Sequence, residues 1–376
     1  MYLTHGGDIY TALLSLKKAP LDFSSNINPL GIPPAVVSAL KENAHTFAAY
    51  PDPLCRRLRS ALSSIHGIDA GQIVCGNGAA DLIHRLAIAC KPREALVTAP
   101  SFSDYEKALE EAGCGVRRFF ARPPGFLIDK SLVSHITNST DMFFLCNPNN
   151  PTGGLVPPDL LRIIIERCTE TNTILVLDEC FNAFLDDPEA NSALRYIPPA
   201  RNRNHRSPKA GTRIVILNAL TKTYALAGLR FGYILCSSLE TARLVAETGQ
   251  TWPVSLAAEC AAFAALKAST YLEESRRLVR AGRAWLKQEL SRLGFEVMGG
   301  EANYVFFKTS EDAVFNRRTF FQDLLERGIL LRSCANYHGL DDSYFRAAVK
   351  NPEENAALIA AIEDLGNSAG GKHDES

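Results

Sequence analysis

Lys222 and Arg230 lie in a stretch, residues 217–233, that is otherwise nearly uncharged. Lys222 follows an apolar run that predicts a buried strand, and Arg230 stands between Gly228 and Gly232. A lysine in an apolar pocket near another cation has a lowered pKa, so its amine can act as a nucleophile. An arginine fork suits a phosphate. A lysine after a strand is usually a surface residue, and the glycine spacing is what favours a site here.

Two further segments fit a ligand that carries both an aldehyde and a phosphate, as pyridoxal phosphate does. Asp178 ends an apolar run, residues 173–177, and so is expected at the carboxyl edge of a sheet, where α/β folds bind ligands. A carboxylate there can keep a pyridine nitrogen protonated. Asn150 lies in the Asn-Pro-rich turn 146–153 and can offer an amide to the ring hydroxyl. A helix cap at Asp178 and a plain tight turn around Asn150 are the alternatives.

The segment 76–81, Gly-Asn-Gly-Ala-Ala-Asp, falls between a predicted strand and a predicted helix. Its small residues let backbone N–H groups and a helix N-terminus cradle a phosphate. The segment is not a dinucleotide fingerprint, because Asp81 replaces the third glycine. A dehydrogenase would rest on this segment alone and is therefore disfavoured.

The elements that must position these residues alternate between short apolar runs and amphipathic stretches. This alternation predicts an α/β fold with a mainly parallel sheet. The expected strands are residues 72–75, 94–98, 142–146, 173–177, 212–217 and 231–236, and the expected helices are 79–90, 103–112 and 158–169.

From residue 255 the pattern changes to one or two long helices, 255–267 and 271–293, followed by strands 304–308 and 345–349 around a helix at 320–327. We expect a large domain at residues 46–254, and a smaller α+β domain at 255–365 that the N-terminal arm, residues 1–45, joins. The basic segment 201–212 is interpreted as a solvated insertion rather than an anion-binding loop. The polar tail, residues 366–376, is expected to be disordered.

The composition excludes several classes of protein. Forty basic and 41 acidic residues give a net charge of −1, so nothing global favours nucleic acid or an anionic membrane. No apolar run reaches the roughly 18 residues of a membrane span, and the start lacks the pattern of a secretion signal. Ten cysteines without Cys-x-x-Cys spacing indicate neither a metal site nor a disulfide framework. We therefore expect a cytoplasmic enzyme with reduced thiols.

The motifs together resemble fold-type I pyridoxal-phosphate enzymes of the aminotransferase class I/II superfamily, over essentially the whole chain. The resemblance rests on Asn-Asn-Pro-Thr-Gly at 149–153, Asp-Glu at 178–179 and Thr-Lys-x₃-Leu-Ala-Gly-Leu-Arg-x-Gly at 221–232. It implies a large domain with a seven-stranded, mainly parallel sheet. It also implies a role for each matching residue. Lys222 would bind pyridoxal 5'-phosphate covalently, Asp178 would pair with the ring nitrogen, and Asn150 would contact the ring hydroxyl. Arg230 and the amides near Gly78, Ala79 and Ala80 would hold the phosphate.

The resemblance extends to residues around the ring and to the substrate. Phe102 falls where the family stacks an aromatic ring on the cofactor, with core packing as the alternative. Tyr50 matches a tyrosine that reaches the cofactor phosphate of the neighbouring subunit, which implies a homodimer with shared active sites. Arg346 matches the arginine that binds the substrate carboxylate. With Arg332 nearby, the substrate is expected to carry two anionic groups.

Within the superfamily, the start of the chain resembles threonine-phosphate decarboxylases of cobalamin biosynthesis. His-Gly-Gly at 5–7, Asp-Phe-Ser-Ser-Asn-Ile-Asn-Pro-Leu-Gly at 22–31, and Phe181 where many aminotransferases have tyrosine carry this likeness. It implies that His5 and Asn28 lie near a phosphorylated substrate. Histidinol-phosphate aminotransferases are close relatives, so transamination stays the alternative. A cofactor-sensing regulator would need a DNA-binding domain before residue 5, and we do not expect that class.

Two positions depart from the pattern. Ala219 stands where the superfamily often has a serine that bonds the cofactor phosphate, and Thr221 is the candidate replacement. Ala227 gives the aminotransferase-like version of its motif, where the decarboxylases often have proline. The second departure bears on the subfamily and leaves the cofactor prediction unchanged.

Overall fold

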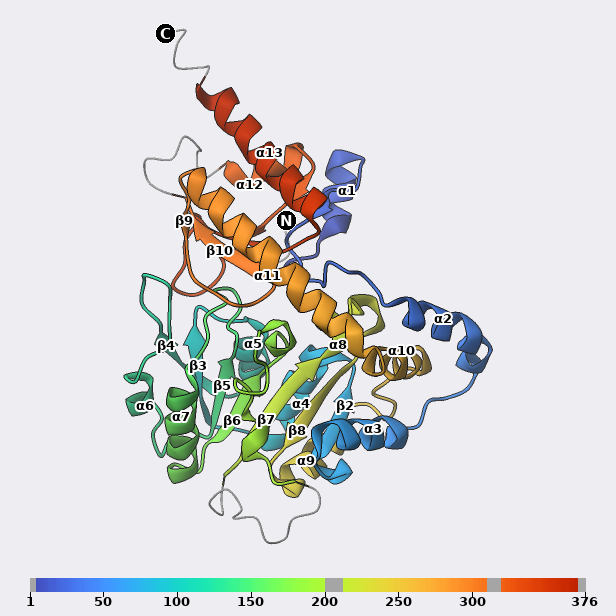
Figure 1. Ribbon diagram of the computed structural model, residues 1–376. Coiled ribbons are helices and arrows are strands. Elements are labelled where there is room, and N and C mark those ends of the chain that lie inside the picture. Colours follow the sequence, from blue (N-terminus) through green and yellow to red (C-terminus); the bar gives the residue numbers. More distant parts are fainter. Residues whose placement is uncertain (1–4, 200–211, 310–318, 371–376) are drawn as a thin grey trace.

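The computed structural model describes residues 5–199, 212–309 and 319–370 (Figure 1). The basic segment, except for Thr212, lies outside the described residues. The described chain forms a large α/β part and a smaller α+β part, and the long helix α11 (Ser269–Arg292) reaches from one to the other. No described helix has both the length and the apolar character that crossing a membrane would require.

The large part is built on a seven-stranded sheet. Its strands, in spatial order, are β2 (Ile73–Gly76), β8 (Gly232–Cys236), β7 (Ile214–Ala219), β6 (Ile174–Asp178), β5 (Met142–Cys146), β3 (Glu94–Ala99) and β4 (Gly115–Phe120). Only β8 runs antiparallel to its neighbours, so the predicted mainly parallel sheet is confirmed. The predicted strands are the inner ones together with β2, whose apolar runs are buried on both faces. The edge strand β4 was not predicted, because its Arg117 and Arg118 break the apolar run.

Helices cover both faces of this sheet (Figure 1). One core cluster packs α4 (Gly78–Cys90), α5 (Asp104–Glu111) and α9 (Leu239–Ala246) on one face. The other cluster packs α3 (Arg56–His66), α6 (Leu132–His135), α7 (Pro158–Glu170) and α10 (Leu256–Leu266) on the opposite face. The short helical turns are η1 (Ala44–Ala48), η2 (Ala70–Gln72), η3 (Asn182–Phe184), η4 (Ala193–Tyr196), α8 (Leu220–Thr223) and η5 (Ala227–Leu229).

The smaller part contains a four-stranded antiparallel sheet. Its order is β12 (Arg332–Ser333), β13 (Tyr344–Ala348), β10 (Tyr304–Lys308) and β9 (Glu296–Val297). Helices α11, α12 (Phe320–Glu326) and α13 (Pro352–Gly370) accompany this sheet. The stretch after residue 255 is two helices, α10 and α11, and not one. Helix α13 continues to Gly370, so residues 366–370 are helical and the expected disordered tail is wrong for them.

The N-terminal arm runs along both parts. Helix α1 (Ile9–Leu16) places Ala12 against α12 and β11 (Ile329–Leu330). Strand β1 (Leu21–Asp22) pairs in parallel with β11, which attaches this stretch to the smaller part. After the proline-rich crossing, α2 (Pro34–Asn43) packs against α10 of the larger part. The arm therefore passes beside the junction of the two parts, where the candidate site lies.

Candidate active site

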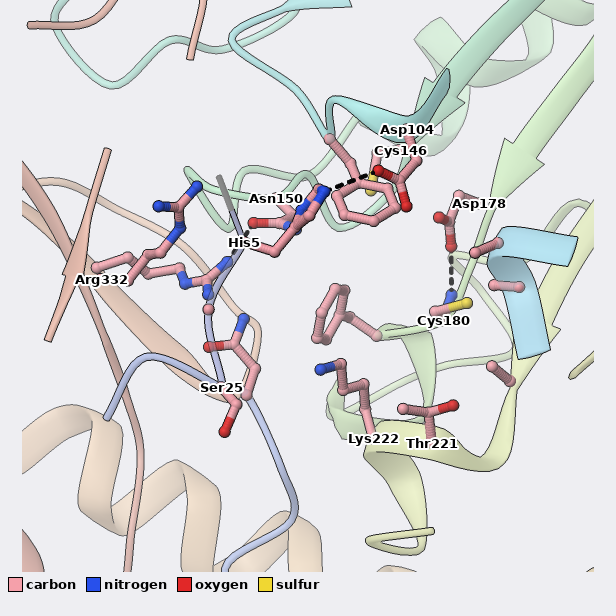
Figure 2. A pocket seen from close by; sticks show the side chains of 18 of the residues that line it. His5, Ser25, Asp104, Cys146, Asn150, Asp178, Cys180, Thr221, Lys222 and Arg332 are labelled. Atoms are coloured by element: carbon pink, nitrogen blue, oxygen red, sulfur yellow. Dashed lines mark hydrogen bonds and ion pairs between the residues drawn. The ribbon is translucent and has the colours of Figure 1, made fainter. Parts of the chain in front are cut away.

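A cavity of about 220 Å³ opens at the carboxyl ends of β5, β6 and β7, between the sheet, the N-terminal arm and the smaller part. It gathers side chains that are far apart in the sequence (Figure 2). The predicted residues that line it are His5, Ala79, Ala80, Phe102, Asn150, Asp178, Phe181, Thr221, Lys222, Arg230, Arg332 and Arg346. Gly78, at the start of α4, lies directly behind this lining, against Arg230.

Lys222 enters the cavity from α8, the short helix that follows β7 (Figure 2). Burial of the amine, with the Arg346 guanidinium as a second cause, lowers the pKa of Lys222 to about 8. A neutral amine is therefore accessible near neutral pH, which is what a nucleophile requires. The Asn28 backbone amide donates to the Lys222 backbone carbonyl at 3.1 Å, so the arm holds the segment that carries the lysine.

Asp178 ends β6 at the floor of the cavity, where it is only 6% exposed. The Tyr105 hydroxyl donates to its Oδ2 at 2.5 Å, and the Cys180 amide donates to its Oδ1 at 2.9 Å. Burial raises the pKa of Asp178, and the Tyr105 bond opposes that rise. A carboxylate held in this way can accept a hydrogen bond from a protonated ring nitrogen.

Asn150 faces the cavity from the turn after β5. Its Oδ1 accepts hydrogen bonds from Arg346 Nη1 and, at 3.3 Å, from the Tyr337 hydroxyl. The carbonyl end of the amide is therefore occupied, and the NH₂ end is the one left to donate into the cavity. Phe181 lines the wall nearby with its ring edge-on to Tyr304, at 5.2 Å between centroids.

The first turn of α4 forms an anion cradle with Arg230. A Cβ on Gly78 would lie 2.6 Å from Arg230 Nη2, and a Cβ on Gly232 would lie 2.8 Å from the Ala79 nitrogen. Only glycine at both positions lets the guanidinium and strand β8 approach the amides of α4 this closely. Asn77 makes no side-chain cap bond, so the first amides of this 13-residue helix stay available to an anion.

These groups fit pyridoxal 5'-phosphate. The cradle suits its phosphate, Asp178 suits its ring nitrogen and Lys222 suits its aldehyde. Ala219 lines the cavity without a hydroxyl, and Thr221 lines it two residues later. That Thr221 replaces the missing serine stays a prediction.

Two arginines of the smaller part line the cavity. Arg332 on β12 and Arg346 on β13 are cross-strand partners, and both are buried. Arg346 Nη2 donates to the Ser24 carbonyl of the arm at 2.6 Å, and its buried Nε has no partner among the described residues. Arg332 Nη2 donates to Asn336 Oδ1 at 2.8 Å. The predicted pair of cations at the substrate end is therefore present in one place.

The structure contradicts the prediction for Asn28, which does not line the cavity. Its Nδ2 donates to the Thr223 carbonyl at 2.7 Å and to Ser275 Oγ at 2.8 Å, and its Oδ1 accepts from the Leu30 amide. All its polar groups are used in holding the arm. Asn26, two residues earlier, lines the cavity instead, and its buried Oδ1 has no partner among the described residues.

Tyr50 is not part of this cavity. Its ring stacks on Trp252 at 4.5 Å, and the residue is 79% exposed. An exposed stacked aromatic pair is compatible with the predicted contact to a second subunit, which stays a prediction.

The functional candidates that the sequence did not indicate include Tyr105, Tyr337 and Asn26. Tyr105 lies in the first turn of α5, three residues after Phe102, which precedes the helix. Asn26 and Asn28 both belong to the motif at 22–31, and the motif does not show which of the two faces the cavity. No local signal marks Tyr337, which lies in the loop after Arg332.

Comparisons with known proteins place this chain in one family. The sequence model of the family "Aminotransferase class I and II" matches residues 18–362. Threonine-phosphate decarboxylase of Salmonella typhimurium is 36% identical over 367 residues, which cover 96% of both chains. Histidinol-phosphate aminotransferase 1 of Cupriavidus pinatubonensis is 33% identical over 90% of this chain and 86% of that protein.

Solved structures show the same two relationships. The histidinol-phosphate aminotransferase from Clostridium acetobutylicum superposes with a TM-score of 0.83 at 30% identity, over 93% of this chain and 99% of that one. The L-threonine-O-3-phosphate decarboxylase from Porphyromonas gingivalis superposes with a TM-score of 0.76 at 25% identity, over 91% and 98%.

Proposed function

The chain belongs to the aminotransferase class I and II family, and we propose that it decarboxylates L-threonine O-3-phosphate. The products would be CO₂ and (R)-1-amino-2-propanol phosphate. The observation that carries this proposal is the arm. Its His5 and Asn26 enter the cavity beside Arg332 and Arg346, in a chain 36% identical to a threonine-phosphate decarboxylase.

The enzyme depends on pyridoxal 5'-phosphate, the cofactor of its family. When bound, the cofactor supplies a ring that accepts the electrons of a bond broken at Cα. Lys222 would hold its aldehyde carbon, Asp178 would keep a proton at the ring nitrogen, and Asn150 would donate to the ring hydroxyl. Arg230, the first amides of α4 and Thr221 would hold its phosphate, while Phe102 would cover the ring.

The chain's own residues would also set the course of the reaction. The Cα bond that would break is the one that these residues hold perpendicular to the bound ring. Arg346 and Arg332 would bind the two anionic groups of the substrate, and their cross-strand pairing keeps the two cations at one end. If they hold the carboxylate perpendicular, the bond from Cα to the carboxylate breaks and CO₂ leaves. Lys222, whose pKa is lowered to about 8, can then deliver a proton to Cα.

Transamination is the second candidate, because histidinol-phosphate aminotransferases of several organisms match at 30–33% identity. The same residues would then orient the substrate so that its Cα–H bond breaks. Phe181 favours the decarboxylase, since a tyrosine hydroxyl at this position is typical of many aminotransferases. Ring-hydroxyl contact is left to Asn150.

The pathway, the oligomeric state and the compartment of the enzyme are part of the same proposal. We place the enzyme in cobalamin biosynthesis, the pathway that the resemblance implies for this substrate. A homodimer that shares its active sites is supported by the exposed Tyr50–Trp252 pair. Ten cysteines, all unpaired, favour a reducing, cytoplasmic compartment.

The test is to incubate the cofactor-loaded protein with L-threonine O-3-phosphate and measure CO₂, with and without 2-oxoglutarate. Release without any keto acid supports decarboxylation. Glutamate formation that requires 2-oxoglutarate, whether from this substrate or from histidinol phosphate, would replace it with transamination. The Lys222→Ala variant is the control that should show neither reaction.

A further inference from the structure

Asp104 places a carboxylate in the lining of the cavity that the substrate's anionic groups must enter. Arg332 and Arg346 line the same cavity. The Asp104 side chain is only 16% exposed and lies in the first turn of α5. An isolated carboxylate there would repel a phosphate or carboxylate ligand, since like charges in a partly buried site disfavour each other. The acid therefore needs a function that outweighs this repulsion.

The Asp104 carboxylate contacts the His5 ring, and this contact indicates its function. The Asp104 Oδ1 lies 3.1 Å from His5 Nε2, as the dashed line in Figure 2 marks. The His5 ring also contacts Phe102, at 5.7 Å between ring centroids. One ring nitrogen is thus committed to the carboxylate, while Nδ1 makes no hydrogen bond to the described residues. A protonated imidazole donates from both nitrogens, so the second donor stays available to a ligand.

The backbone around His5 is anchored to the substrate arginine. The Gly7 amide donates to Ser24 Oγ at 2.7 Å, and the Ser24 carbonyl accepts from Arg346 Nη2. A Cβ on Gly6 would lie 2.1 Å from the Ser24 carbonyl oxygen, so only glycine permits this crossing. The arm is therefore anchored beside Arg346, and Asp104 and Phe102 connect its histidine to the larger part.

We propose that Asp104 is a positioning residue that orients His5 toward the phosphate of the substrate, and so selects phosphorylated amino acids. The inference rests on the proposed function for the identity of that substrate. Asp104 does not touch the substrate itself. Its carboxylate fixes the imidazole ring and bridges the arm to α5.

A double-mutant cycle tests this assignment on the cofactor-loaded enzyme. Asp104→Asn should raise KM for L-threonine O-3-phosphate about 10-fold, the effect of weakening one charge-assisted hydrogen bond. It should leave kcat within about threefold, because the group acts in binding. His5→Gln should have an effect at least as large, and the double variant should be no worse than His5→Gln alone. Fully additive effects would overturn the proposal, since Asp104 would then act without His5.

Two further variants separate positioning from loss of charge or fold. Asp104→Glu keeps the carboxylate and should recover most of the lost affinity. Glu111→Gln removes a carboxylate from the same helix that also pairs with a histidine, since Glu111 Oε2 lies 3.0 Å from His84 Nε2 outside the cavity. It should leave KM unchanged. A KM rise in Glu111→Gln equal to that in Asp104→Asn would reduce the effect to general helix electrostatics and overturn the assignment.

A binding measurement keeps this inference distinct from the proposed function. Calorimetry with inorganic phosphate should give about 10-fold weaker binding to Asp104→Asn than to the wild type. Wild-type enzyme that releases no CO₂ would reject the decarboxylase, while the phosphate comparison would still decide the role of Asp104. Equal phosphate binding by the two proteins would overturn it.

Discussion

Replacing Gly78 with alanine should weaken cofactor binding through its contact with Arg230. The added Cβ would lie 2.6 Å from Arg230 Nη2, whereas ordinary contact begins at 3.4 Å. The guanidinium would therefore retreat by about 0.8 Å, the difference of the two distances. Displacing one charge-assisted hydrogen bond by this much costs about 1.5–3 kcal/mol. The dissociation constant of the cofactor should then rise about 10- to 100-fold.

The backbone adds a second cost, which a control can subtract. Gly78 has a φ of +83°, a region where an L side chain costs roughly 1–2 kcal/mol. Gly67 ends α3 with a φ of +69°, and a Cβ there would meet nothing within 4 Å. Gly67→Ala should therefore lose similar stability without loss of cofactor affinity.

The assay is a titration of cofactor-free protein with pyridoxal 5'-phosphate, followed by the absorbance of the lysine-bound cofactor, beside urea unfolding of each variant. The reasoning fails if Gly78→Ala binds the cofactor as tightly as the wild type. It also fails if Gly67→Ala loses the same affinity, because the defect would then come from general destabilisation.

Three other outcomes follow from the site. The rate at which cofactor-free protein attaches pyridoxal 5'-phosphate should rise with pH and level off above a midpoint of about 8, because only the neutral Lys222 amine attacks. Stopped-flow absorbance that showed the rate still climbing steeply well above pH 8, with no midpoint there, would show that the pKa of Lys222 is not lowered. Tyr105→Phe removes a hydrogen-bond donor from the buried Asp178 carboxylate and raises the pKa of Asp178 further. Urea unfolding should show that the variant loses about 1.5–3 kcal/mol of stability, and this loss should shrink as pH falls and Asp178 is protonated. A loss of stability that did not depend on pH would contradict this prediction. Asn28→Ala should cost about 1–3 kcal/mol of unfolding free energy through three lost hydrogen bonds, with little change in substrate KM. Asn26→Ala should raise KM and spare stability, and the reverse pattern would refute the revised assignment.

The sequence by itself determined the cofactor chemistry and the parallel sheet. Lys222, Asp178 and Asn150 each follow an apolar run, and parallel strands present their carboxyl ends at one edge, so three distant segments could be brought together on paper. The glycines at 78 and 232 were also informative, because the close approach of neighbouring groups leaves no room for a larger residue at either position. Runs buried on both faces were predictable, since their continuous apolar character survives any arrangement of neighbours.

Only the tertiary structure decided which arm residues face the cavity and which partners hold the catalytic groups. Asn26 and Asn28 have the same chemistry and neighbouring positions, and the choice between them depends on what Thr223 and Ser275 offer across the fold. The Tyr105 bond to Asp178 and the Asp104 contact to His5 join residues 73 and 99 positions apart, respectively. Such contacts arise from the packing of α5 and the arm, which local sequence patterns do not encode.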